Sequence, residues 1–177
     1  GVADVPCISN FTDLESLAGE PDVRIVRVAG PVAEPLDLLI FPGAKQTAQA
    51  LRFVKDCGID KIAEDVLAGG GMVIGICGGY QMLGRRLCDP ERVESSHAVL
   101  EGVGLLDAET IFARPKVTRR VTGIHRPSGA MIDGYEIHMG RTVTKDDVEP
   151  FLDLCADGGG GRNCEGAVSR DGRVIGT

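Results

Sequence analysis

The chain has 177 residues, of which 43% are hydrophobic, and its formal net charge is −7. This size and composition suit one globular domain with a hydrophobic core, and the negative charge argues against a nonspecific nucleic-acid-binding protein. There is no signal peptide and no apolar run near the roughly 20 residues that span a bilayer, so we expect a cytoplasmic protein with no membrane partner.

The six cysteines do not form a disulfide framework or a metal-binding pattern. They are scattered along a chain that can build a core without cross-links, and no CxxC pair or cysteine–histidine cluster suggests zinc. We therefore expect free thiols in a reducing compartment and no metal site.

The first half of the chain alternates apolar runs with helical patterns, which is typical of a parallel sheet covered by helices. A glycine triplet at residues 69–71 then separates the last helix from an apolar run. The expected strands are residues 23–28, 36–41 and 72–76, and the expected helices are 47–55 and 59–67.

The second half has few helical patterns. The acid-rich residues 145–149 are interpreted as a solvated helix start or loop, and residues 157–161 as a surface loop. The expected strands are 105–112, 116–122 and 130–137, followed by a hairpin of 166–169 and 173–176 around Asp171-Gly172. The fold class is therefore α/β in one domain of residues 1–177, a mostly parallel sheet flanked by helices, with an added antiparallel segment in the C-terminal half.

Residues 75–84, GICGGYQMLG, are the most informative segment. Cys77 follows an apolar run and is flanked by glycines, and residues from Gln81 onward have a helical pattern. This pattern predicts a strand–turn–helix nucleophile elbow with cysteine as the nucleophile. We expect the glycines to relieve backbone strain and the helix N-terminus to favour the thiolate. The alternative is a buried, inert structural cysteine.

These residues indicate attack of a thiolate on a carboxamide. Cys77 would form a thioester, and the N–H of Gly78 would donate to the oxyanion. Gly43, in the turn after the strand at 36–41, is the second candidate donor, because ends of neighbouring parallel strands open into one crevice. Gln81 lies one helical turn after Cys77 and is a candidate for the same pocket. Alone, however, Pro42-Gly43 is more often just a turn.

Residues 75–84 resemble the nucleophile segment of class I, or triad-type, glutamine amidotransferases, and most closely the glutaminase domains of the cobyric acid synthase family. The similarity covers nearly the whole chain in order and implies the α/β fold of that class. Supporting segments are residues 8–13, 41–45, 135–142, 166–169 and 171–174.

The resemblance implies that the domain hydrolyses glutamine and passes ammonia to an N-terminal synthetase domain. In that family the synthetase uses ATP and Mg²⁺ to amidate corrinoid carboxylates, converting adenosylcobyrinic acid a,c-diamide to adenosylcobyric acid in cobalamin biosynthesis. No phosphate-binding loop of the type GxxxxGK[ST] occurs here, so we expect no cofactor in this domain and a chain that is the C-terminal part of a longer synthase.

The family's catalytic histidine follows a Gly-Thr pair, whereas this sequence ends at Gly176-Thr177. We therefore expect the general base beyond Thr177, and a weak or inactive glutaminase for the chain as given. Among the three histidines, His138 is the best candidate substitute. The resemblance, however, implies that its segment forms a wall of the glutamine pocket and does not supply the base, and a structural role is also open. His97 and His125 lie in polar surroundings and are expected to be solvated.

Four other side chains near the motifs are candidates for the site, and three of them have a second interpretation. Arg141 is a candidate to bind the α-carboxylate of glutamine. Lys45 either helps to hold a substrate carboxylate or is solvated. Tyr80 either closes the glutamine pocket or packs in the core. Glu136 either orients His138, with which it shares a strand face, or is solvated.

Two other functions remain open at this point. A glutaminase that amidates a cell-wall precursor shares the segment 76–81, although residues 9–13 and 138–142 favour the cobyric acid synthases. A catalytically silent binding or redox-sensing domain on the same fold would keep Cys77 and lack the histidine.

Overall fold

The computed structural model describes residues 1–10, 12–145, 148–156 and 163–177. Its largest sheet has seven strands in the order β11-β14-β15-β4-β3-β1-β2, and five of them, from β2 to β15, run parallel. The strands are β1 (Val2–Ala3), β2 (Arg27–Val28), β3 (Leu38–Phe41), β4 (Met72–Gly75), β11 (Val148–Glu149), β14 (Ala167–Ser169) and β15 (Val174–Gly176).

Helices cover this sheet. The helix α3 (Ile59–Ala68) packs on β3 and β4, and α2 (Thr47–Asp56) packs on α3 and on α4 (Gly78–Leu83). The buried positions of α2, among them Ala50, Leu51 and Val54, recur at the three- and four-residue spacing of one helix face. With Leu39 and Phe41 of β3 they belong to a single core. A short 3₁₀ turn (Thr12–Leu14) leads into α1 (Glu15–Ala18).

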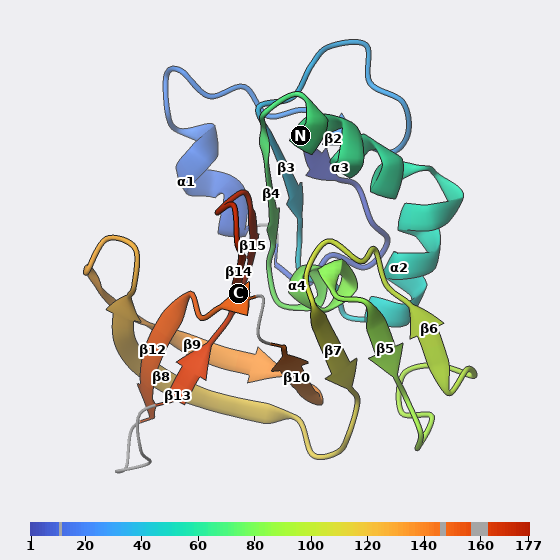
Figure 1. Ribbon diagram of the computed structural model, residues 1–177, viewed down its shortest axis with the longest axis vertical. Coiled ribbons are helices and arrows are strands. Elements are labelled where there is room, and N and C mark those ends of the chain that lie inside the picture. The colour runs from blue at the N-terminus through green and yellow to red at the C-terminus, as the bar shows by residue number, and fades with distance from the viewer. Residues whose placement is uncertain (11, 146–147, 157–162) are drawn as a thin grey trace.

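Two four-stranded sheets lie beside the parallel sheet, below it in Figure 1. One has the order β10-β7-β5-β6 and the other β13-β12-β8-β9. The first contains β5 (Arg86–Cys88), β6 (Val99–Glu101), β7 (Ala108–Ile111) and β10 (Arg141–Thr144); the second contains β8 (Val117–His125), β9 (Met131–His138), β12 (Leu152–Ala156) and β13 (Asn163–Glu165). β8 and β9 pair antiparallel over eight residues, from Val117 with His138 to Ile124 with Met131.

The α/β fold with a mostly parallel sheet and an antiparallel C-terminal addition is confirmed, as are the helices α2 and α3 and the hairpin β14–β15. The prediction of a strand at residues 23–28 is wrong for its first four residues. Only Arg27 and Val28 pair with the neighbouring strand β1, because β1 is two residues long. The strands β1, β5 and β6 are too short to stand out in the sequence. The segment 157–161 and residues 146–147 lie outside the described residues, while Val148 and Glu149 form a strand and not a helix start.

None of the described helices is long and apolar enough to cross a membrane.

Candidate active site

Cys77 lies in a sharp turn between β4 and α4, as the elbow pattern predicts. Its backbone has φ 51° and ψ −110°, a conformation that L-residues rarely adopt and that costs about 1–3 kcal/mol. The flanking glycines at 75, 78 and 79 do not have positive φ, so our explanation for them was wrong. They are needed for space: a Cβ on Gly79 would overlap the carbonyl group of Phe41, so α4 sits directly on β3.

The ends of three strands meet at Cys77. Its backbone N–H donates to the Thr177 carbonyl, just past β15, at 2.6 Å. Its thiol donates to the Ile137 carbonyl near the end of β9 at 3.4 Å. The nucleophile is therefore held between the parallel sheet and the β8–β9 pair.

The two glycines proposed as oxyanion donors lie next to Cys77. A Cβ placed on Gly43 would be 3.6 Å from the Cβ of Cys77, and one on Gly78 would be 3.1 Å from the backbone N of Ala44. The Gly43 turn is fixed from its other side, because its carbonyl accepts the N–H of Ser9 at 2.8 Å. The Gly78 N–H hydrogen-bonds the Cys77 thiol, and the Gly43 backbone lies beside Cys77. The role of these two N–H groups as an oxyanion hole stays a prediction.

Our expectation of a resting thiolate at Cys77 is wrong. Burial raises the pKa of the Cys77 thiol, and the N–H of Gly78 and the charge of Lys116 oppose this only in part. Asp13 and Glu94 raise the pKa further. A base must therefore remove the thiol proton when the nucleophile acts.

Gln81 is buried, with 6% of its surface exposed, and both ends of its amide are hydrogen-bonded. Its Nε2 donates to the Met139 carbonyl at 3.1 Å, and its Oε1 accepts from the Thr47 hydroxyl at 3.3 Å. Gln81 thus ties the turn after β9 to α2 across the base of the elbow. Contact of Gln81 with glutamine remains a prediction.

His138 and Glu136 form a charged cluster with Arg119 on β8. The His138 Nε2 lies 2.8 Å from one oxygen of Glu136, and Arg119 Nε donates to the other at 2.7 Å. Burial alone would raise the pKa of Glu136, but the hydrogen bonds from Arg119 and His138 lower it overall. Glu136 is therefore paired, not solvated. His138 Nδ1 lies 2.9 Å from the Gly140 carbonyl, so both ring nitrogens already face oxygen atoms.

The other three candidate side chains differ in burial. Tyr80 is buried with its ring against Gly176, which is the core interpretation, and its contact with glutamine stays untested. Arg141 begins β10 and is exposed. Lys45 is exposed, and its backbone N–H donates to Cys7.

Sequence reasoning missed the residues that reach the elbow from distant segments. Thr47, Glu94 and Lys116 carry no motif of their own. The side chain of Glu94 lies against the first turn of α2, where its Oε2 accepts the N–H of Ala48 at 3.4 Å. Burial raises the pKa of Glu94. The only sequence signal for any of these three residues is that Thr47 begins the helix that follows the Gly43 turn.

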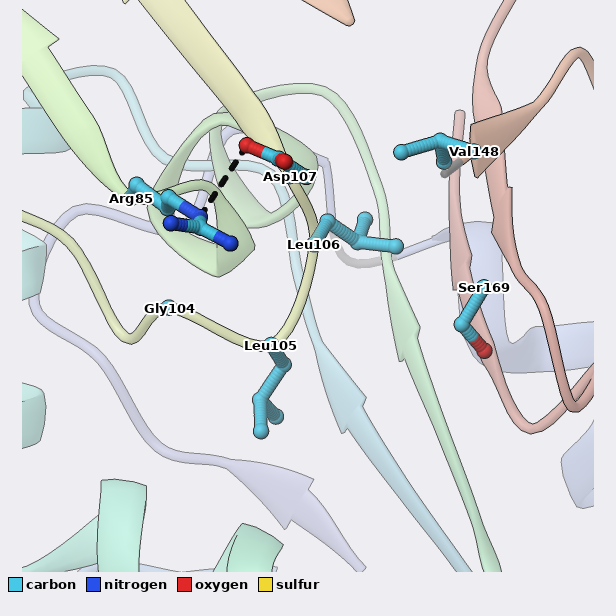
Figure 2. A pocket seen from close by; sticks show the side chains of 7 residues that line it. All are labelled: Arg85, Gly104, Leu105, Leu106, Asp107, Val148 and Ser169. Carbon is cyan, nitrogen blue, oxygen red and sulfur yellow. Dashed lines mark ion pairs between the residues drawn. The ribbon is translucent and has the colours of Figure 1, made fainter. Parts of the chain in front are cut away.

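Two cavities lie away from Cys77. One of about 770 Å³ opens beside residues 31–37 and α3, near the N-terminal ends of β3 and β4, whereas Cys77 follows the C-terminal end of β4. The other, of about 190 Å³, contains the Arg85–Asp107 ion pair at 3.0 Å, with Leu105, Leu106 and Ser169 around it (Figure 2). Within the described part of the chain, no group of three or more His, Cys, Asp or Glu could hold a metal ion. All six cysteines are free.

Comparison with known families identifies the family of the chain. The profile of the CobB/CobQ-like glutamine amidotransferase domain matches residues 1–177. The chain belongs to this family. Curated relatives include a cobyric acid synthase of Listeria monocytogenes serotype 4b (strain F2365), 42% identical over 176 residues, and one of Cereibacter sphaeroides, 46% identical over 172 residues. The matches cover 98% and 96% of this chain but 34% of each relative, so the chain spans about a third of their length.

Solved structures agree on the fold. A glutamine amidotransferase covers 100% of the chain with a TM-score of 0.67 and 17% identity, and 87% of that protein is matched. The PurLQS structure from Thermotoga maritima has the same TM-score and identity over 98% of this chain and 82% of the matched one. At such identity the likeness establishes the architecture alone.

Proposed function

We propose that this domain hydrolyses glutamine at Cys77 and supplies the ammonia to an ATP-dependent synthetase that amidates corrinoid carboxylates in cobalamin biosynthesis. The observation that carries the proposal is the position of Cys77 in a strained elbow, with the backbone of Gly43 and Gly78 beside it. The names of the curated relatives favour a corrinoid acceptor over a cell-wall precursor.

The chemistry needs few groups. The Cys77 thiolate attacks the side-chain carboxamide carbon of glutamine, and backbone N–H groups of Gly78 and Gly43 stabilise the tetrahedral oxyanion. The C–N bond then breaks as a base returns its proton to the nitrogen, which leaves as ammonia. Water hydrolyses the thioester to glutamate and regenerates the thiol.

The base is the histidine expected after Thr177 in the longer polypeptide. Because the Thr177 carbonyl accepts the Cys77 N–H, residues that follow Thr177 begin beside the nucleophile. His138 is a poorer base, since its two ring nitrogens are bound to Glu136 and to the Gly140 carbonyl.

The acceptor and the nucleophile can be tested together in the full-length polypeptide. Amide formation on a corrinoid acid is measured with ATP and either glutamine or ammonium chloride as nitrogen source. We expect Cys77→Ser to lower the glutamine-dependent rate by at least about 10³-fold and to leave the ammonium-dependent rate intact. Cys88→Ser, at another half-buried cysteine, is the matched control and should change neither rate.

The base is tested by glutamine hydrolysis alone. The 177-residue chain is compared with the full-length polypeptide and with its His138→Asn variant. We expect the full-length protein and His138→Asn to release Cys77-dependent ammonia, and the 177-residue chain to be far slower. Equal activity of the short chain, lost in its own His138→Asn variant, would assign the base to His138.

A further inference from the structure

Exposed apolar side chains are concentrated on the two small sheets. Among the described residues seven large apolar side chains are exposed, and six of them lie on strands of these sheets. Three stand at alternate positions of β9: Met131, Tyr135 and Ile137 are 86%, 72% and 44% exposed. Alternate residues of a strand point to one side, so the three share one face of β9.

The strand pairing extends this face onto β8. Tyr135 lies opposite Arg120, Ile137 opposite Thr118, and Met131 opposite Ile124. We call these six residues the β9 face. An exposed ion pair between Arg120 and Asp133 lies on the same side. Methionine, tyrosine and arginine are enriched in protein–protein interfaces. Lysine, glutamate and aspartate are depleted there; the β9 face lacks all three, and Asp133 on the same side is paired with Arg120.

The β9 face borders the nucleophile. The carbonyl of Ile137 accepts the Cys77 thiol at 3.4 Å, and the turn that follows is tied to the elbow through Gln81 and the Met139 carbonyl. Residues at the intervening positions, Glu136 and His138, are only partly exposed and point to the opposite side of the strand. A protein that covers the β9 face therefore reaches the edge of the Cys77 site.

We propose that the β9 face is the docking surface for the ATP-dependent synthetase part of the longer polypeptide. This rests on the function proposed above. The chain spans about a third of its curated relatives, so a large part of such a protein lies outside it. Ammonia released into water at neutral pH is protonated and diluted, so its transfer requires a covered route that begins at Cys77. The β9 face supplies an apolar contact area for the synthetase part at the edge of the Cys77 site.

The test uses the full-length polypeptide with both Met131 and Tyr135 changed to Asp, and with Val99→Asp as the control. Val99 is equally apolar and 50% exposed, but it lies on β6 in the other small sheet. We expect the double variant to lose about tenfold in glutamine-dependent amidation, with more glutamate formed per amide. Its ammonium-dependent rate and that of Val99→Asp should stay within about twofold of the unchanged protein.

Hydroxyl-radical footprinting of Met131 gives a readout independent of activity. We expect Met131 in the full-length protein to be oxidised far more slowly than its 86% exposure in this domain implies. Rapid oxidation together with unchanged coupling would overturn the docking surface. So would a change in oligomeric state without loss of coupling, which would assign the face to a second copy. If the unchanged protein shows no Cys77-dependent amidation, the proposed function itself fails.

Discussion

The two sides of the Cys77 site are built by different physical means. On the elbow side, α4 is entirely buried against β3, β4 and β15, and glycines allow backbone to touch backbone. On the other side, β9 alternates exposed and half-buried positions and is joined to β8 by ion pairs such as Arg119–Glu136. The nucleophile is thus fixed by close packing, and the wall opposite by polar contacts that leave a surface free. We therefore expect similar substitutions in the two regions to change the free energy of unfolding by very different amounts.

The largest contrast is expected from adding one methyl group on each side. Gly79→Ala would force a Cβ into the Phe41 carbonyl, whereas Gly134→Ala in β9 would meet no atom within 4 Å. We expect Gly79→Ala to lower the free energy of unfolding by about 3 kcal/mol or to prevent folding, and Gly134→Ala to be neutral or slightly stabilising. Denaturant unfolding measures both. Equal effects of the two substitutions would contradict the comparison.

A smaller effect is expected from the charged cluster. Glu136→Gln removes the carboxylate that holds Arg119 and His138, and we expect a loss of about 2 kcal/mol in unfolding free energy at neutral pH. The folded pKa of Glu136 is lowered, so its contribution is present above the ordinary value of 4.5 and is lost as the pH falls through the folded pKa.

The pH dependence of that loss is the check. The stability difference between Glu136→Gln and the unchanged protein should shrink steadily below pH 4.5. Asp133→Asn breaks an exposed pair with Arg120 and should leave the unfolding midpoint nearly unchanged. A larger loss for Asp133→Asn than for Glu136→Gln would show that burial does not set the strength of these pairs.

The smallest effect concerns the reactivity of the sulfur. Lys116 lowers the pKa of Cys77 and Asp13 raises it. Because only the thiolate is alkylated, Lys116→Gln should slow iodoacetamide labelling of Cys77 about twofold at about pH 8, and Asp13→Asn should speed it. Peptide mapping by mass spectrometry separates Cys77 from the other five cysteines. Shifts in the same direction for both variants would rule out an electrostatic cause.

The sequence predicted the elbow better than its surroundings because the elbow is local. The strand, the glycine-flanked Cys77 and the helix all lie within residues 72–83. The contacts of Cys77 with Ile137 and Thr177, and of Gln81 with Thr47, join segments that no local pattern relates.

The direction of the Cys77 pKa was missed for the same reason. The helix N-terminus and its Gly78 N–H are visible in the sequence, but the burial that raises the pKa of Cys77 more than this N–H lowers it comes from the tertiary packing. The strand at 23–28 failed likewise, since apolar alternation cannot show that the neighbouring strand pairs over only two residues.

The most direct test of the central claim, that Cys77 is the nucleophile, is to trap the covalent intermediate. Full-length protein is mixed with glutamine, quenched in acid within the first turnover, and analysed by peptide mass spectrometry. We expect a glutamyl adduct on the peptide that contains Cys77, absent from Cys77→Ala. Release of ammonia by Cys77→Ala, or an adduct on a different residue, would contradict the account.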